Sequence, residues 1–141
     1  GSHYGAKLDW SDVQMLERYN PLKAYKRSKL ANVLFTAELN RRIGPQELQA
    51  AAADPGLVNT GIGEKAGSQL ANRIWSWRRR RGLPPEKAAA GILKLLLEVD
   101  LSEHPAAYWK HGKPRMPNPF GLDPDHGRRL WQISARMTGV S

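Results

Sequence analysis

Residues 20–45 carry clear signals for where a helix begins and ends. Asn20 can cap the free amide groups of a first turn, and Pro21 stands where its missing N–H costs nothing. Gly44-Pro45 is an equally strong stop. Between these signals apolar residues recur mostly every three or four positions, at Leu22, Leu30, Val33, Leu34, Ala37 and Leu39. The pattern predicts one long amphipathic helix over about 21–43, and any fold of this chain must cover one of its faces.

The remaining elements are weaker predictions. We expect a short helix between Asp9 and Tyr19, and residues 47–53 are open between helix and a buried strand. Further along the chain the patterns favour helices over about 68–80 and 85–99, a short strand over 106–110, a loop over 111–122, and a capped helix from Asp123-Pro124 to Gly139. About five helices and at most two strands leave a sheet with bare edges. The chain is therefore either mainly helical or part of a larger α/β domain.

Composition narrows the function classes. The chain has 141 residues, a length typical of one domain, and it contains no cysteine. A disulfide framework, thiolate zinc ligation and a cysteine nucleophile are thus excluded. The four histidines lack metal-ligand spacing, so no metal site is expected. The formal net charge of +9 suggests nucleic acid or an anionic surface as a partner. No apolar run has transmembrane length, and residues 1–4 do not look like a signal peptide, so a cytoplasmic location is expected.

Tyr25 and Lys29 stand four residues apart on the best-predicted helix. This spacing places both side chains on one face, within reach of a common ligand. A cation held near a phenol favours the phenolate and lowers the tyrosine pKa. The pair therefore suits proton transfer to or from a substrate oxygen. The spacing is common, however, and a surface tyrosine beside a solvated lysine is the alternative.

The residues around this pair carry a resemblance to a known family. Residues 24–36, AYKRSKLANVLFT, resemble the Tyr-x-x-Ser-Lys active-site helix of the short-chain dehydrogenase/reductase family, particularly its retinol-dehydrogenase-like members. Residues 54–60, DPGLVNT, are similar to the family's Pro-Gly-x-Val-x-Thr segment after the sixth strand. Ala107-Tyr108-Trp109 and residues 129–134, RLWQIS, continue the resemblance to the C-terminus.

The resemblance implies the C-terminal part of a Rossmann-type doubly wound parallel sheet, rich in helix, with the N-terminal strands absent. It implies a single unit, residues 1–141, that is the C-terminal half of an NAD(P)-dependent oxidoreductase interconverting an alcohol and a carbonyl, with NADP favoured and a small lipophilic substrate. Tyr25 would be the acid–base residue, and Lys29 would lower its pKa and bind the nicotinamide ribose. Residues 61–82 would form a lid. Cofactor-binding positions would be Tyr25, Lys29, Pro55, Gly56, Val58 and Thr60.

The family's phosphate-binding loop and Asn-Ala-Gly motif belong to its first half and have no counterpart here. Gly61-Ile62-Gly63 fits a Gly-x-Gly pattern but lacks the surrounding βαβ unit, so we interpret it as part of the lid. Ser2 lies near the place of the catalytic serine, yet Gly-Ser-His is also what a cleaved tag leaves. The resemblance thus implies that this chain alone lacks half of the cofactor cleft, and that its partner is a missing N-terminal half or a second copy.

Trp75 to Arg81 concentrates two tryptophans and four arginines. Arginines at a helix end favour the helix dipole, which gives a purely structural explanation. Contact with an anionic membrane surface is a second reading, and binding of nucleic acid is the least favoured. The competing function class is therefore a non-catalytic basic module that binds through these residues.

Overall fold

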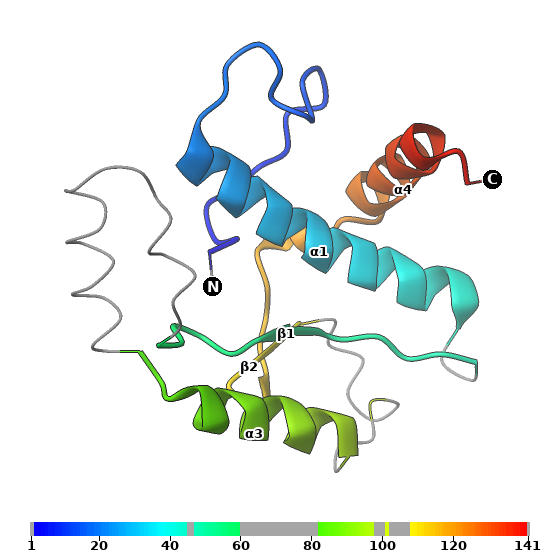
Figure 1. Cartoon of the computed structure of the whole chain (residues 1–141). Coiled ribbons are helices and arrows are strands. Elements are labelled where there is room, and N and C mark those ends of the chain that lie inside the picture. Colours follow the sequence, from blue (N-terminus) through cyan, green and yellow to red (C-terminus); the bar gives the residue numbers. More distant parts are fainter. Residues whose placement is uncertain (1, 45–46, 60–81, 98–100, 102–107, 141) are drawn as a thin grey trace, which may run out of the picture. The chain divides into compact units, whose positions relative to one another are not determined.

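The computed structural model describes residues 2–44, 47–59, 82–97, 101 and 108–140 (Figure 1). The chain divides into two compact units. The first contains Gly1–Ala52, Asp100–Trp109 and Pro114–Ser141, and the second contains Ala53–Val99 and Lys110–Lys113. The expected helix over 68–80 lies outside the described residues, as does the lid apart from Gly82.

Helix α1, Pro21–Ile43, has the predicted bounds. The Asn20 side chain accepts a hydrogen bond from the Lys23 amide, and the Gly44 amide donates to the carbonyl of Asn40. The buried face is not quite the predicted one, because Leu22 is exposed. The positions of α1 that are buried are Leu30, Val33, Leu34, Thr36 and Glu38. A buried carboxylate on this face is tolerated because Glu38 forms ion pairs with Arg41 and Arg42, one helical turn away.

Helix α4, Pro124–Thr138, packs against α1 within the first unit. The Asp123 side chain caps its start, and Gly139 ends it in the left-handed conformation. A short 3-10 helix, η2 (Pro119–Leu122), lies between them. Its Gly121 permits close packing, since an added Cβ would lie 3.1 Å from Val33 Cγ1. The core of the first unit consists of Ala6, Leu8, Leu30, Leu34 and Leu130.

The described strands form one sheet in the order β1-β2-β3, with β1 at Ala52–Asp54, β2 at Tyr108–Lys110 and β3 at Lys113–Pro114. Strands β1 and β2 are parallel, and helix α3 (Pro85–Leu97) lies between them in the sequence. Figure 1 shows the succession β1, α3, β2. A parallel pair joined through a helix is the basic unit of α/β folds. The chain is thus a helix-rich part of a Rossmann-type α/β fold, as the sequence indicated.

The predicted short helix between Asp9 and Tyr19 is wrong, since this segment consists of turns and bends. Its two aspartate side chains bind backbone amides of the segment, including two that would bond to backbone carbonyls in a helix, those of Leu16 and Glu17. Asp9 accepts hydrogen bonds from the amide and hydroxyl of Ser11, and Asp12 accepts from the amides of Leu16 and Glu17. Such local hydrogen bonds compete with helix formation.

The predicted loop over 111–122 is wrong in part, because it contains β3 and η2. His111 and Gly112 both have positive φ, at 52° and 69°, and the Arg115 amide donates to the carbonyl of Tyr108. Two successive positive φ values are typical of a tight hairpin turn, which joins β2 to β3. The strand expected over 106–110 corresponds to β2, whose described part begins at Tyr108. Of the two alternatives for residues 47–53, the strand is found at the end of the segment, where β1 begins at Ala52.

None of the described helices is long and apolar enough to cross a bilayer.

Candidate active site

Tyr25 and Lys29 lie on one exposed face of α1, in its N-terminal half. The Lys29 Nζ atom is 5.4 Å from the centroid of the Tyr25 ring, and the Tyr25 side chain is 48% exposed. The next residue, Leu30, is fully buried, so packing on the other face fixes how the helix is turned. The Ser28 hydroxyl donates to the Tyr25 carbonyl at 2.9 Å. The phenol and the ammonium group thus face solvent together, as the four-residue spacing predicted.

The N-terminal segment is attached to α1 beside this pair. The Arg27 side chain donates to the carbonyl of Lys7 at 3.2 Å, and its guanidinium lies 3.9 Å from the Asp9 carboxylate. Hydrogen bonds from Ser11 hold the pKa of the Asp9 carboxyl below its ordinary value, with a smaller contribution from Arg27. These contacts tie residues 7–11 to the helical turn that carries Tyr25.

Pro55, Gly56 and Val58 belong to the second unit, at the end of β1. The Gly56 amide donates to the Asp54 carboxylate at 2.7 Å, and the His111 amide donates to the Asp54 carbonyl at 3.1 Å. Gly56 has a φ of 80°, and a Cβ added there would lie only 2.2 Å from His111 Cε1. Glycine is therefore required by its own backbone and by the neighbouring imidazole.

Sequence reasoning missed His111. The available signal was the His-Gly pair directly after the expected strand, because adjacent residues that tolerate positive φ favour a hairpin turn. The turn brings the His111 side chain against the segment where cofactor-binding residues were expected.

Val58 forms a parallel bridge with Leu83. The Asn59 amide donates to the Leu83 carbonyl at 2.9 Å, and the Leu83 amide donates to the Leu57 carbonyl at 2.7 Å. The two ends of the segment that carries Thr60, the lid and Trp75–Arg81 are thus held together. Thr60 and Trp75–Arg81 themselves lie outside the described residues.

The predicted site residues therefore fall into two groups. Tyr25 and Lys29 come together on α1 in the first unit, and Pro55, Gly56 and Val58 follow β1 in the second. Within the described parts of the chain, no three histidine, aspartate or glutamate side chains are placed to hold a metal ion. The exposed phenol and ammonium suit hydroxyl groups of a sugar or an alcohol, because one can donate or accept and the other only donates.

Comparison with known proteins finds similarity to dehydrogenases. The chain is 32% identical to retinol dehydrogenase 13 of Homo sapiens over 148 residues, which cover 99% of this chain and 44% of that protein. It is 30% identical to retinol dehydrogenase 14 of Mus musculus and 29% identical to polyprenol dehydrogenase of Homo sapiens, covering 41% and 43% of those proteins. The chain thus spans less than half the length of the curated relatives it matches.

No protein-family model matches the chain, and no solved structure matches it significantly. The three relatives named above are all dehydrogenases. Over nearly its whole length the chain is similar to the C-terminal part of retinol-dehydrogenase-like members of the short-chain dehydrogenase/reductase family.

Proposed function

We propose that the protein containing this chain is an NAD(P)-dependent oxidoreductase that interconverts an alcohol and a carbonyl, with Tyr25 as the acid–base residue. The observation that carries the proposal is the Tyr25–Lys29 pair, which shares an exposed face of α1 with Lys29 Nζ 5.4 Å from the tyrosine ring. The similarity to named dehydrogenases over 99% of the chain supports the reaction class.

In the proposed reaction the Tyr25 hydroxyl gives its proton to the carbonyl oxygen during reduction and takes it back during oxidation. The Lys29 ammonium group stabilises the phenolate that remains, and it binds ribose hydroxyls. A nicotinamide cofactor, when bound beside Tyr25 and Lys29, would supply the chemistry of hydride transfer. The buried residues of α1 fix the orientation of the helix that carries both groups.

Pro55, Gly56, Val58 and Thr60 are proposed to line the cofactor. The described part of this segment fits such a role through its backbone, because the Asp54 carboxylate and His111 hold the Gly56 turn in one conformation. NADP is favoured over NAD by the family resemblance. The names of the relatives suggest a lipophilic alcohol or carbonyl as the substrate.

The test is the reduction of retinal by the full gene product that contains this segment, with NADPH and NADH compared. Tyr25→Phe removes the proton donor and is expected to lower kcat by about 10²–10⁴-fold, the usual contribution of a positioned acid–base group. Lys29→Ala is expected to lower kcat and also to weaken cofactor binding, measured by fluorescence of the reduced cofactor.

Tyr19→Phe and Lys23→Ala are matched controls, since Tyr19 is exposed and Lys23 lies on the first turn of α1, outside the proposed site. Both variants should keep kcat within about twofold, as expected for surface substitutions. A Tyr25→Phe enzyme with the kcat of the controls would contradict the proposed role.

Contact with an anionic membrane through Trp75–Arg81 remains a prediction, as does a homo-oligomer or a separate N-terminal half as partner. The alternative function, a non-catalytic basic module, depends on Trp75–Arg81 as well, and these residues lie outside the described part of the chain.

A further inference from the structure

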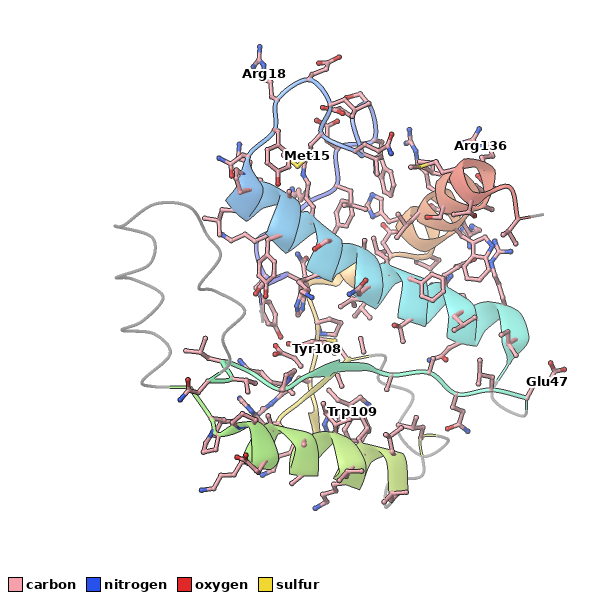
Figure 2. The ribbon with its side chains drawn as sticks, in the orientation of Figure 1. Met15, Arg18, Glu47, Tyr108, Trp109 and Arg136 are labelled. Carbon is pink, nitrogen blue, oxygen red and sulfur yellow. The ribbon has the colours of Figure 1, made fainter. Side chains whose placement is uncertain are left out.

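A groove of about 670 Å³ lies in the first unit, between the loop that begins at Trp10 and the outer face of α4. Its volume is within the range of small-molecule sites. Figure 2 labels Met15, a buried residue of this loop, and Arg136 on α4, which lines the groove. Neither Tyr25 nor Lys29 lines the groove, so it is separate from the proposed catalytic pair.

The loop wall has a fixed conformation. The Asp12 carboxylate accepts hydrogen bonds from the amides of Leu16 and Glu17, and the Met15 amide donates to the Asp12 carbonyl. Met15 is buried and has a φ of 56°, which is uncommon for a residue with a long side chain. This conformation leaves the neighbouring Leu16 side chain 79% exposed at the groove. An apolar side chain is thus held in solvent by an ordered loop.

Trp10, at the start of the loop wall, is held in place by stacking. Its ring stacks on His126 at 5.6 Å and on Phe120 at 6.2 Å, measured between centroids. Phe120 and His126 are themselves stacked at 3.7 Å. A wall held by aromatic stacking needs little ordering when a ligand binds, and such preorganisation favours affinity.

The α4 wall combines cations with apolar side chains. The Arg129 guanidinium lies 5.0 Å from the Trp10 ring centroid, and Arg136 stands seven residues further, on the same face and about 10 Å along the helix. Ile133 and Met137 also line this wall. Among the described residues neither Arg129 nor Arg136 has a carboxylate partner.

The two carboxylates of the groove do not neutralise these arginines. Asp125 forms an ion pair with Arg128, and the Asp12 carboxylate accepts backbone amides of its own loop. Within the part of the chain that the structure describes, the guanidinium groups of Arg129 and Arg136 thus lack carboxylate partners and stand beside exposed apolar side chains. Guanidinium groups bind carboxylate and phosphate strongly. Apolar side chains of Leu16 and Met137 favour a hydrocarbon chain.

We propose that this groove binds a single-tailed amphiphile with an acidic head group, a carboxylate or a phosphate, which pairs with Arg129 and Arg136 while its tail lies along Leu16 and Met137. A bilayer surface is the less favoured occupant, because the cations and apolar groups line a concave site of ligand size. The proposal is independent of the oxidoreductase function and uses none of its residues.

The test measures binding of cis-parinaric acid, a fluorescent fatty acid, to the full 141-residue chain. We expect saturable binding that competes with a lysophosphatidic acid and not with a neutral alcohol of equal tail length. Arg129→Gln and Arg136→Gln should each weaken the affinity about tenfold, as loss of a charge-assisted hydrogen bond does. The inhibition constant of lysophosphatidic acid, compared with that of an unlabelled fatty acid of equal tail length, tells phosphate from carboxylate as the preferred head group.

Arg115→Gln is the control for net charge, since Arg115 is exposed and outside the groove. Leu16→Ser is expected to weaken binding, and Leu22→Ser, another exposed leucine on the same unit, is expected to leave it unchanged. Equal loss in Arg115→Gln and Arg136→Gln would overturn the proposal. So would equal competition by the neutral alcohol, or binding to anionic vesicles without saturable binding of the monomeric probe.

Discussion

Helices α1 and α3 differ in how their apolar side chains are covered. In α1, Leu30, Val33 and Leu34 are at most 2% exposed. In α3 only Ala88 and Leu95 are buried, while Ile92, Leu93, Leu96 and Leu97 are 38–79% exposed. Yet α3 is the more apolar sequence, with leucines at three of its last four helical positions. Apolar content alone therefore does not locate the core of this chain.

The difference lies in the partners available within each unit. Helix α1 packs against α4 and η2, and the core of the first unit forms at their contact. Of the described residues, few cover α3. Regions with few buried apolar contacts open more readily than well-packed ones. We therefore expect the stability of the chain to depend mainly on the first unit, and the comparison can be tested by substituting matched residues in the two helices.

The largest expected effect is from Leu30→Ala. Leu30 is fully buried, so its truncation leaves a cavity that should cost about 2–5 kcal/mol of unfolding free energy. The measurement is urea unfolding followed by circular dichroism. Leu96→Ala is the matched variant in α3, where the side chain is 72% exposed, and it should cost less than about 0.5 kcal/mol. Equal losses of unfolding free energy in the two variants would mean that the apolar side chains of α3 are buried to the same extent as those of α1.

Gly56→Ala tests the packing of the second unit and should have the next largest effect. The added Cβ would meet the His111 ring, and alanine is strained at a φ of 80°, so a loss of about 1–3 kcal/mol is expected. Hydrogen exchange of the Leu83 amide, which bonds within the same unit, reports this loss locally.

Two further variants separate the clash from the strain. Gly5→Ala has a similar φ of 72° with no neighbour within 4 Å, so it should show the backbone strain alone. His111→Ala combined with Gly56→Ala removes the clashing ring and should recover part of the loss. If the double variant is no more stable than Gly56→Ala, the imidazole is not the obstacle.

The smallest effect concerns the start of α4. The Asp125 and His126 amides donate to the Asp123 carboxylate and hold its pKa below the ordinary value. The folded state therefore favours the ionised group, and this stabilisation is lost as pH falls from about 5 towards 2. Asp123→Asn should keep the cap but flatten this part of the pH profile of unfolding. The pKa of Asp9 is also lowered, so Asp9 contributes to the dependence of unfolding free energy on pH in the same direction. The substitution Asp9→Asn would remove this second contribution. An unchanged slope in Asp123→Asn would contradict the assignment.

The capped helices could be predicted from sequence because their signals are local. Asn20-Pro21 and Asp123-Pro124 mark starts, and Gly44 and Gly139 mark ends, so the bounds of α1 and α4 follow. The shared face of Tyr25 and Lys29 follows from the same helix. The prediction of a helix within residues 9–19 is wrong, because the backbone conformation of this segment depends on which amides Asp9 and Asp12 bind. Composition does not decide between a helix and such side-chain-capped turns.

The contacts at Gly56 could not be predicted in the same way. The glycine suggested a turn, but the reason for it is His111, which is distant in the sequence and reaches Gly56 through the β2–β3 hairpin. Likewise, the polarity of Glu38 predicts an exposed side chain, yet this side chain is buried. Its ion pairs with Arg41 and Arg42 explain the burial. Contacts between distant residues depend on the fold, which single-sequence patterns do not contain.

The hydrogen bonds between Leu57, Asn59 and Leu83 have a consequence for how this protein can vary. These hydrogen bonds join the two ends of the segment between Asn59 and Leu83. The rest of the second unit is therefore connected to the same two fixed ends whatever the length of that segment. Doubling a connection between fixed ends costs only about 0.6 kcal/mol. A protein engineer can therefore exchange this segment for a shorter or longer one while keeping the two strands of backbone that Leu57, Asn59 and Leu83 join.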